Sequence, residues 1–308
     1  MPQMLDGSKV AAEIRQEIKE QIQHNTGNRC DLSHGVPIGT LEKPPCLAMV
    51  LCSEDPASKV YVKKKQEACD ECGITSYLIK PFDGGIEKWG QPKEHLMSTI
   101  DYLNNDSSIH GILVQLPLPK ELDAREVFDR INPLKDVDVF SPTNVGLLLQ
   151  GRPRFVPCTP QGIQELLTRS GIQIAGQKVA IINRSDIVGK PLSALLVQDH
   201  GKANATIFMC HDQTPPDRLK EVCLASDIIV VAVGIPGFLT PDMVPAGAIV
   251  VDVGINRLPD TKKLVGDVNP DVYPKTRAYS TVPGGVGPCT VASLMKNVLQ
   301  AQKLLDLS

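Results

Sequence analysis

The sequence predicts an α/β protein with two domains, each built on a mostly parallel sheet. Short apolar runs alternate with longer amphipathic segments along most of the chain, which is the pattern of parallel strands joined by helices. The length of 308 residues is enough for about two domains. A segment with three prolines, 147–160, separates two such alternating series and marks the expected boundary.

The first series follows an N-terminal segment of helical periodicity, whose apolar stripe is formed by Val10, Ile14, Ile18 and Ile22. A loop rich in Gly, Pro, Asn and Ser is expected at 25–45. Strands and helices then alternate. In chain order they are a strand at 46–52, a helix at 57–72, a strand at 75–80, a helix at 91–104, a strand at 111–116 and a helix at 124–131.

The second series starts after the proline-containing boundary. Its elements are a helix at 161–171, strands at 178–183, 205–210, 227–234 and 248–254, and a closing amphipathic helix at 290–305. We expect the closing helix to return to the first domain. The first domain is therefore expected to comprise 1–150 and 290–308, and the second 151–289.

Composition and charge exclude several classes of protein. The net charge of −3, the pI near 6.1 and the 4% aromatic content do not match a nucleic-acid-binding surface. No apolar run is long enough to span a membrane, and the N-terminal segment has no apolar region typical of a targeting peptide. Nine scattered cysteines indicate a reduced, cytoplasmic protein. Cys69 and Cys72 have C-x-x-C spacing without further zinc ligands, and no metal is expected.

The segment "KVAIINRSDIVGKPLSALL" reads as a strand, a tight loop and a helix, the context in which a pyrophosphate docks on a helix N-terminus. The loop contains only Gly189, with Asn183 at the first small position, and a generic α/β loop would look similar. Asp212 follows Asn183 by 29 residues, near where a ribose hydroxyl would be bound. Gly234 and the "DVGIN" segment with Ile255 end two further strands, where backbone approaches a ligand closely.

Several short motifs stand at the predicted loops and strand ends. They are "YVKKK", "GILVQLPLP" and "NPLKDVDVF" in the first half, and "NRSDIVGKP", "DVGIN", "GDVN" and "PGGVGPCTVASLMKN" in the second. Their order and spacing resemble the bifunctional methylenetetrahydrofolate dehydrogenase/methenyltetrahydrofolate cyclohydrolase family, from about residue 5 to 305. The 25–45 loop lies outside the resemblance.

The resemblance implies an N-terminal folate-binding catalytic domain, a Rossmann-like NAD(P)-binding domain, a cleft between them and a homodimer. It also implies two reactions. One oxidises 5,10-methylenetetrahydrofolate to 5,10-methenyltetrahydrofolate with NAD(P), and the other hydrolyses the methenyl compound to 10-formyltetrahydrofolate.

The three consecutive lysines do not form one feature. On a helix, Tyr61 and Lys65 are four residues apart and share a face, whereas Lys63 and Lys64 point elsewhere and are expected in solvent. By position in the family pattern, Lys65 resembles the catalytic lysine and Tyr61 its hydrogen-bonded partner. Gln115, at the carboxyl end of a predicted strand, would help to orient the amine.

The chemistry explains why an amine is needed. Oxidation of the methylene bridge leaves a cationic N–C–N carbon, which a protonated lysine would oppose. A free lysine has a pKa of about 10.4, so the neutral amine requires desolvation or nearby positive charge, part of which the substrate cation supplies. A neutral Lys65 could help deliver water to the cation, which is the cyclohydrolase step, and then shuttle the proton.

Asp138 in "KDVDVF" is expected to accept hydrogen bonds from the amino-pyrimidine edge of the pterin. The alternative is a turn aspartate that caps its own backbone. The resemblance favours Asp138 over Asp136, and the family usually has Gly where this chain has Val139. Further substrate contacts are expected from Val114, Leu116, Pro283, Gly284, Gly285, Val286 and Gly287.

The glycine-rich segment at 282–288 has two interpretations. It is either a tight turn before the last helix or a rigid loop whose backbone lies against substrate and nicotinamide, and the resemblance favours the second. Cys289 stands where Met is common in the family.

Arg184 and Ser185 resemble the residues that hold the 2′-phosphate of NADP. Asp212 departs from that pattern, because relatives often carry Ser or Arg there, and Asn183 replaces the usual Gly. A carboxylate near the phosphate opposes its binding. NADP is therefore the expected cofactor, with NAD plausible because of Asp212.

Three rival interpretations remain. A short-chain dehydrogenase also uses Tyr-x-x-x-Lys, but its nucleotide loop opens the chain, whereas here Tyr61 precedes that loop by more than a hundred residues. A nucleotide-sensing or scaffolding protein would not need Tyr61, Lys65, Gln115 and Asp138 together. A protein with only the cyclohydrolase activity is the third. Assays of both activities separate these interpretations.

Overall fold

The computed structural model of the protein describes residues 1–26, 43–258, 260–261 and 263–307. Of the predicted 25–45 loop, residues 27–42 lie outside the described residues, and the helix that precedes the loop extends to Thr26. The chain divides into two compact units. The three-stranded unit comprises 13–144 and the chain from 294 onwards, and the six-stranded unit comprises 1–12 and 145–293. The prediction of two α/β domains is confirmed.

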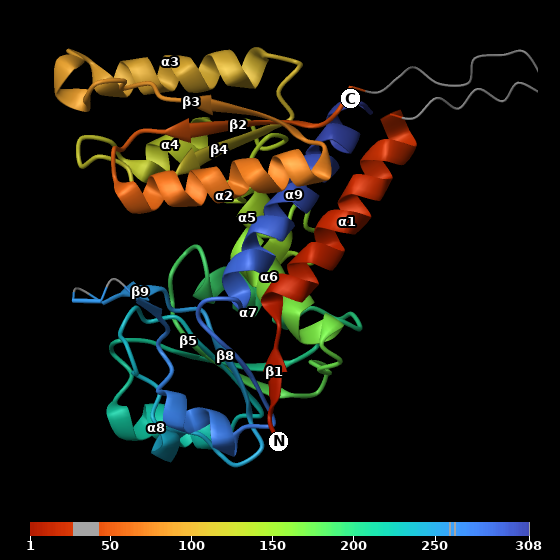
Figure 1. Cartoon of the computed structure of the whole chain (residues 1–308), viewed down its shortest axis with the longest axis vertical. Coiled ribbons are helices and arrows are strands. Elements are labelled where there is room, and N and C mark those ends of the chain that lie inside the picture. The colour runs from red at the N-terminus through yellow and green to blue at the C-terminus, as the bar shows by residue number, and fades with distance from the viewer. Residues whose placement is uncertain (27–42, 259, 262, 308) are drawn as a thin grey trace, which may run out of the picture. The chain divides into compact units, whose positions relative to one another are not determined.

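The three-stranded unit has a parallel sheet in the order β3-β2-β4. Its strands are β2 (Cys46–Leu51), β3 (Thr75–Ile79) and β4 (Gly111–Gln115), and all of β2 is buried. Helices α2 (Pro56–Cys72) and α3 (Pro92–Asn105) lie on opposite faces of this sheet (Figure 1). Helix α4 (Ala124–Arg130) joins α3 in one apolar core with Val50 and Val114.

Helix α2 forms where it does because both ends are capped. The Asp55 side chain accepts a hydrogen bond from the Ser58 backbone N–H at 2.8 Å, and Pro56 occupies the first turn. At the other end Gly73 adopts φ 79°, the left-handed conformation that suits a glycine C-cap. The prediction of 57–72 was therefore correct to one residue, and Lys65 lies in the middle of a well-defined helix.

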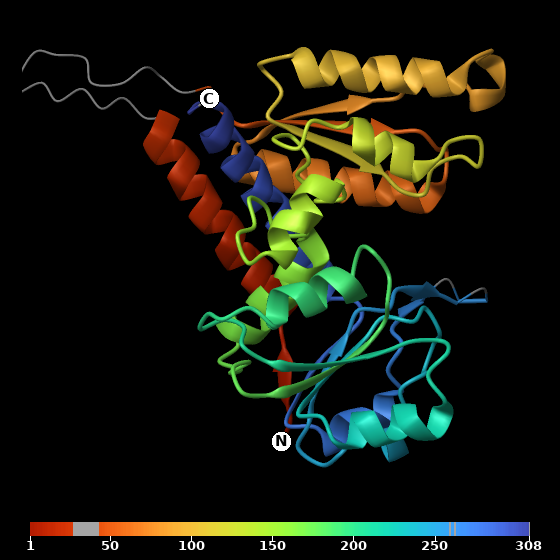
Figure 2. The same ribbon diagram turned by 180° about the vertical axis from the view of Figure 1, so that it is seen from behind.

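The six-stranded unit has a wholly parallel sheet with helices on both faces (Figures 1 and 2). In sheet order the strands are β1 (Gln3–Leu5), β11 (Ala278–Ser280), β8 (Ile249–Asp252), β7 (Ile228–Val231), β5 (Lys178–Ile182) and β6 (Thr206–Cys210). The chain turns from β5 to the outer strand β6 and then back to β7. Ligands of open α/β sheets bind at the carboxyl edge beside such a reversal.

The remaining elements are short or connect these layers. The helices are α1 (Gly7–Thr26), α5 (Pro142–Leu149), α6 (Cys158–Arg169), α7 (Gly189–Leu196), α8 (Pro216–Leu224) and α9 (Val286–Leu305). A small antiparallel pair consists of β9 (Asn256–Arg257) and β10 (Leu264–Val265). The predicted stripe on α1 is buried, from 5% exposed at Val10 to 2% at Ile14.

Several elements differ from the predictions. Residues 3–5 form a strand because β1 pairs with β11, which places residues 1–12 in the six-stranded unit. Neither three-residue strand carries a period that a sequence could reveal. The strand predicted at 227–234 ends at Val231, and the last helix begins at Val286 rather than 290. The closing helix contributes its residues from Leu294 to the three-stranded unit.

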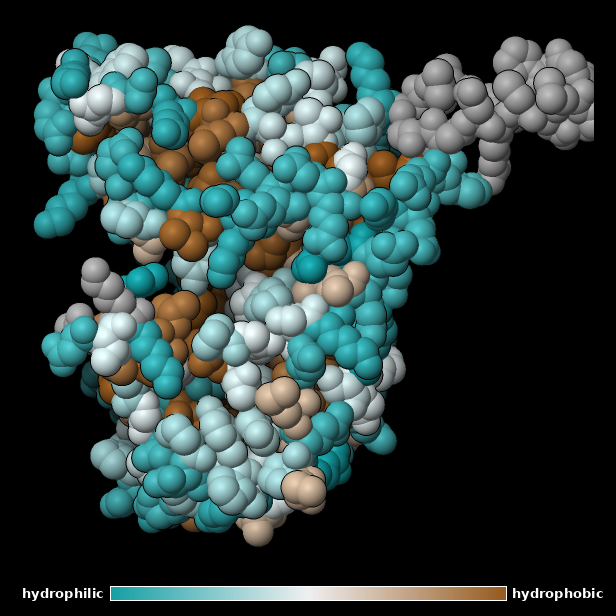
Figure 3. Space-filling model, viewed as in Figure 1, coloured by the Kyte–Doolittle hydropathy of each residue, from teal (hydrophilic) through white to brown (hydrophobic). Residues whose placement is uncertain are grey.

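The surface seen in Figure 3 is mainly hydrophilic, with apolar residues showing in patches. Cys69 and Cys72 are fully buried on α2, and burial raises the pKa of each thiol to about 12. Within the described residues, no group of three or more His, Cys, Asp or Glu side chains could hold a metal ion. No helix in the described part of the chain combines the length and apolar character needed to cross a membrane.

Candidate active site

The amine of Lys65 is held by a side chain at the end of β4. Lys65 Nζ donates a hydrogen bond to Gln115 Oε1 at 3.0 Å, and Gln115 Nε2 donates to the Leu116 carbonyl at 2.7 Å. The second bond fixes the amide so that its oxygen faces the lysine. Lys65 is half-buried, whereas Lys63 and Lys64 are exposed as predicted. Helix α2 therefore points one lysine of the three at the carboxyl edge of the sheet.

The residues around Lys65 and Gln115 differ in how much of each is accessible to a ligand. Tyr61 lies one helical turn before Lys65 and is half-buried. Val114 is 2% exposed and packs in the core on the sheet face opposite to Gln115, so only its backbone is available for the predicted substrate contact. Leu116 is half-buried and follows the strand.

Asp136 is a structural residue. Its carboxylate accepts hydrogen bonds from the backbone N–H groups of Val139, Phe140 and Ser141 at 3.0, 3.1 and 2.9 Å. The side-chain amide of Asn144 adds a fourth bond at 3.0 Å, and the residue is 2% exposed. A carboxylate has about four acceptor positions, so Asp136 has none left for a substrate.

The loop that Asp136 organises carries Asp138, whose side chain is half-buried. Val139 adopts φ 67°, a left-handed conformation that disfavours a β-branched residue, which explains why Gly suits this position. Lys135 anchors the other side of the loop: its ammonium donates to the carbonyls of Leu103 and Asp106 at 2.9 and 2.7 Å, near the end of α3. Burial lowers the pKa of Lys135.

Asn183 organises the loop after β5. Its Oδ1 accepts hydrogen bonds from Ser185 N at 2.8 Å, Ser185 Oγ at 2.7 Å and Gly189 N at 2.9 Å, while Nδ2 donates to the Ala232 carbonyl at 2.5 Å. A Cβ at Gly189 would overlap the Asn183 carbonyl, so the start of α7 needs glycine there. The Ser185 hydroxyl gives its one proton to Asn183 and accepts from Val188 N at 3.1 Å, so it has no proton left for a phosphate in this conformation.

Arg184 and Asp212 form an ion pair beside this loop. The guanidinium Nη2 lies 2.5 Å from Asp212 Oδ1, and the two side chains are 49% and 64% exposed. Gln213 Nε2 donates to the other carboxylate oxygen at 3.1 Å. The hydrogen bond from Gln213 and the charge of Arg184 lower the pKa of Asp212, which keeps it ionised at neutral pH. A phosphate held by Arg184 must therefore compete with a carboxylate.

The glycine-rich segment is only partly a loop. Gly284 adopts φ 97°, and a Cβ at Gly285 would lie 2.6 Å from the Thr281 carbonyl, so both positions require glycine for internal reasons. Val286 is 4% exposed and opens helix α9, which corrects the expectation of a loop to 288. Gly287 has open space where a Cβ would be, as does the left-handed Gly234 after β7. A ligand can therefore approach the Cα side of both glycines closely.

Three more predicted residues have simple positions. Pro283 lies in this segment directly before Gly284, and Ile255 follows β8 with 47% of its surface exposed. Cys289 is fully buried, and its thiol donates to the Gly7 carbonyl at 3.3 Å, so the smaller residue is accommodated against the start of α1.

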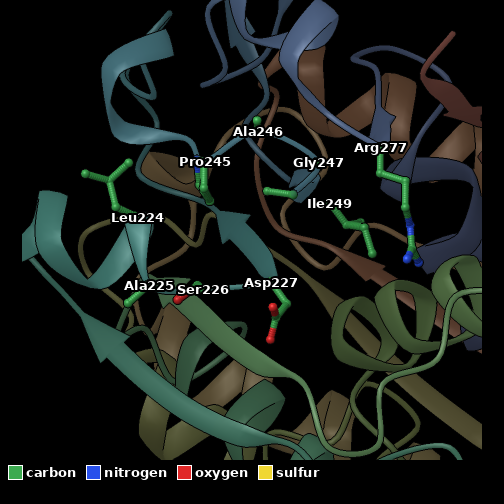
Figure 4. A pocket seen from close by; sticks show the side chains of 10 residues that line it. Leu224, Ala225, Ser226, Asp227, Pro245, Ala246, Gly247, Ile249 and Arg277 are labelled. Atoms are coloured by element: carbon green, nitrogen blue, oxygen red, sulfur yellow. The ribbon is translucent and has the colours of Figure 1, made fainter.

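A cavity on the six-stranded unit lies elsewhere. It has a volume of about 220 Å³, and its lining includes Asp227, Gly247, Ile249 and Arg277 (Figure 4). These residues precede or begin β7, β8 and β11, so the cavity opens at the amino edge of the sheet. The predicted cofactor residues follow strands β5, β6, β7 and β8 at the opposite edge, and none of them lines this cavity.

Comparison with protein families accounts for nearly the whole chain. The catalytic-domain model of tetrahydrofolate dehydrogenase/cyclohydrolase matches residues 5–138, and the NAD(P)-binding-domain model of the same enzyme matches 157–305.

The chain belongs to the tetrahydrofolate dehydrogenase/cyclohydrolase family.

Curated relatives and solved structures of this family are similar to the chain over nearly its full length. The chain is 46% identical to the bifunctional protein FolD of Rhodopirellula baltica, over 97% of both chains. A crystal structure of the FolD dehydrogenase/cyclohydrolase of Campylobacter jejuni is 40% identical, covers 99% of both chains and superposes with a TM-score of 0.85. The Trypanosoma brucei FolD, solved with NADP and an inhibitor, is 33% identical over all of both chains with a TM-score of 0.86.

Two residues differ from the family pattern described above, and the structure shows what each of them contacts. Asn183, in place of Gly, ties the ends of β5 and β7 together through Ala232. Asp212 neutralises Arg184. Sequence reasoning missed the buried aspartates of "DVGIN" and "GDVN", Asp252 and Asp267. Asp252 stands two residues before a glycine and Asp267 directly after one, and each has a valine beside it.

Proposed function

We propose that Lys65, oriented by Gln115, serves both reactions of this tetrahydrofolate dehydrogenase/cyclohydrolase. The single observation that carries the proposal is the 3.0 Å hydrogen bond between Lys65 Nζ and Gln115 Oε1 at the carboxyl edge of the three-stranded sheet. The substrates are 5,10-methylenetetrahydrofolate, oxidised to the methenyl compound, and the methenyl compound, hydrolysed to 10-formyltetrahydrofolate. Tyr61, on the same helix face, is the second group that positions the amine.

The folate-binding residues divide by role in this proposal. Asp138 accepts hydrogen bonds from the amino-pyrimidine ring, and Lys65 faces the one-carbon bridge. In the oxidation an unprotonated amine avoids opposing the positive charge that develops at the bridge carbon. In the hydrolysis the same amine directs a water molecule to that carbon and takes up one of its protons. It passes this proton to N5 as the bond between N5 and the bridge carbon breaks, and the second water proton leaves to solvent. The oriented Gln115 keeps the nitrogen in place in both steps.

NADP is the proposed cofactor, with NAD also accepted. When bound, it supplies the hydride acceptor for the oxidation. The carboxyl edge suits a dinucleotide, because Gly234 is left-handed with open space at its Cβ and Ile255 exposes an apolar side chain. Arg184 is the cation proposed to bind a 2′-phosphate, because Ser185 already donates its hydroxyl proton to Asn183.

The Arg184–Asp212 pair leads to a prediction about cofactor choice. We expect Asp212→Ser to raise the ratio of kcat/KM for NADP to that for NAD by about two- to fivefold, the effect typical of an exposed charge pair. The released guanidinium can then bind the 2′-phosphate without competition. The measurement is initial-rate kinetics with both cofactors.

Asp217→Ser is the matched control for this prediction, because Asp217 is an exposed carboxylate on neighbouring α8. It should leave the ratio unchanged. An unchanged ratio in Asp212→Ser would remove Asp212 from cofactor selection.

A homodimer through the six-stranded unit is also proposed. Among the described residues β6 is an edge strand, so its outer backbone groups are available to pair with another chain. Met209 on this strand is 37% exposed, and Ile207 and Phe208 are half-buried. Sedimentation of the protein and of Met209→Lys tests the proposal; a monomeric parent protein would contradict it.

The charge and the buried cysteines support a cytoplasmic enzyme without nucleic-acid or membrane partners.

Paired assays test the proposed function as a whole. The protein should reduce NADP in the presence of methylenetetrahydrofolate, and it should accelerate the loss of methenyltetrahydrofolate absorbance without any cofactor. Absence of either activity from the folded protein would contradict the bifunctional assignment.

A further inference from the structure

A buried aspartate connects the two loops expected to contact the dinucleotide. Asp267 lies between β10 and the 3₁₀ turn at Pro270–Lys275 and is 0% exposed. Its Oδ2 accepts hydrogen bonds from Val233 N at 2.6 Å and Gly234 N at 2.9 Å, in the loop after β7. Its Oδ1 accepts from Asn256 Nδ2 at 2.8 Å, at the end of the loop after β8.

The position of Asp267 is fixed by an interlock with Asp252. Asp252 Oδ1 accepts hydrogen bonds from the backbone N–H groups of Gly254 and Asp267 at 3.0 and 2.9 Å, and its Oδ2 accepts from Val268 N at 3.0 Å. A Cβ at Gly254 would overlap the Asp267 carboxylate, and a Cβ at Gly266 would overlap that of Asp252. Each aspartate therefore fits against the glycine of the other motif, so neither loop can shift alone.

The residues next to Gly234 and Asn256, which both donate to Asp267, are apolar and exposed to solvent. Ile235 follows Gly234 and is 52% exposed, and Ile255 precedes Asn256 and is 47% exposed. Exposed isoleucines on two loops at the same edge of the sheet are suited to pack against a flat ring of a ligand. Asp267 itself cannot touch such a ligand, because it is fully buried and its oxygens accept three internal bonds.

We propose that Asp267 is a positioning residue for the dinucleotide: its carboxylate holds the loops that carry Gly234 and Ile255 in the geometry that binds the cofactor. The inference rests on the proposed function and deepens it for the same site. A carboxylate suits this position because it can accept from three donors at once, and such charge-assisted bonds are about twice as strong as neutral ones. An amide has its acceptor oxygen on one side only, so in Asp267→Asn an NH₂ group faces either the two backbone N–H groups or the Asn256 side chain.

The bifunctional chemistry offers an internal control. Hydrolysis of the methenyl compound transfers no hydride, so it does not require the loops that Asp267 holds. A loss confined to cofactor binding therefore separates a positioning role from general unfolding. Calorimetric titration with NADP measures the Kd without turnover.

Asp267→Asn is the decisive variant. We expect the Kd and KM for NADP to rise about tenfold, a change that corresponds to about 1.4 kcal/mol. The cyclohydrolase rate should stay within about twofold of the parent protein, as expected for a change that spares the folate site. Asp271→Asn, an exposed carboxylate four residues away, is the matched control and should change neither quantity.

Asn256→Ala keeps the test decisive if Asp267→Asn does not fold. It removes one donor to the same carboxylate, so a rise of about threefold in the Kd for NADP is expected with hydrolysis intact. An unchanged Kd in whichever variant folds overturns the proposal, as does an equal loss of both activities in folded protein. Failure of the proposed function is distinct, because it would appear as a missing activity in the parent protein.

Discussion

Replacing Lys65 by Met lowers the methenyltetrahydrofolate hydrolysis rate by about 10²- to 10⁴-fold, the usual contribution of a positioned proton-transfer group. Met keeps the length and apolar stem of lysine but removes the amine that Gln115 orients at 3.0 Å. Because Lys65 is only half-buried on α2, the helix should fold normally. The measurement is loss of methenyl absorbance at saturating substrate, with thermal unfolding recorded in parallel.

Lys63→Met is the matched control, since Lys63 is 77% exposed and lies 3.9 Å from Glu67 on the same helix. It removes the same charge two residues away and should change the rate by less than about twofold, as surface changes usually do. Hydrolysis that persists in Lys65→Met, or an equal loss in Lys63→Met, would show that another group activates the water.

Replacing Asp136 by Ala strongly lowers the free energy of unfolding, although Asp136 makes no proposed contact with substrate. Three backbone N–H groups and the Asn144 amide lose their acceptor inside a buried loop. Each unsatisfied buried donor costs about 1–3 kcal/mol, so we expect a loss of at least about 3 kcal/mol in the free energy of unfolding. That is a large part of the 5–15 kcal/mol typical of a native protein. Urea unfolding measures the change.

Asp138→Asn separates the two aspartates of the motif. The amide is isosteric but cannot accept on both atoms, so the KM for folate should rise about tenfold or more, while stability changes much less than in Asp136→Ala. If Asp138→Asn destabilised the protein as strongly and left the folate KM unchanged, the pterin role assigned to Asp138 would be wrong.

Part of the fold can be predicted from the sequence, because helix caps, short apolar runs and helical spacing are local patterns. Helix α2 carries its caps at Asp55 and Gly73, and the strand runs before Gln115 and Asn183 are apolar and short. The choice of Lys65 among three lysines follows from the four-residue spacing to Tyr61. The resemblance supplied the roles, and the burial of each lysine agrees with that choice.

Other features depend on residues that are distant in the chain. Gln115 is 50 positions from Lys65, and Asn183 is 49 from the carbonyl it binds at Ala232. No local pattern distinguishes Asp136 from Asp138, since the difference is the set of N–H groups that the folded loop presents. Asp267 acts on Val233, 34 positions earlier, so only the folded sheet reveals its role.

A crystal structure of the protein with bound folate tests the central claim most directly. We expect Lys65 Nζ to lie about 3–4 Å from the one-carbon bridge or from a water molecule beside it, a separation at which reaction is possible, with Gln115 still bonded to the amine. A side chain of Lys65 directed into bulk solvent, with another group at the bridge, would contradict the account.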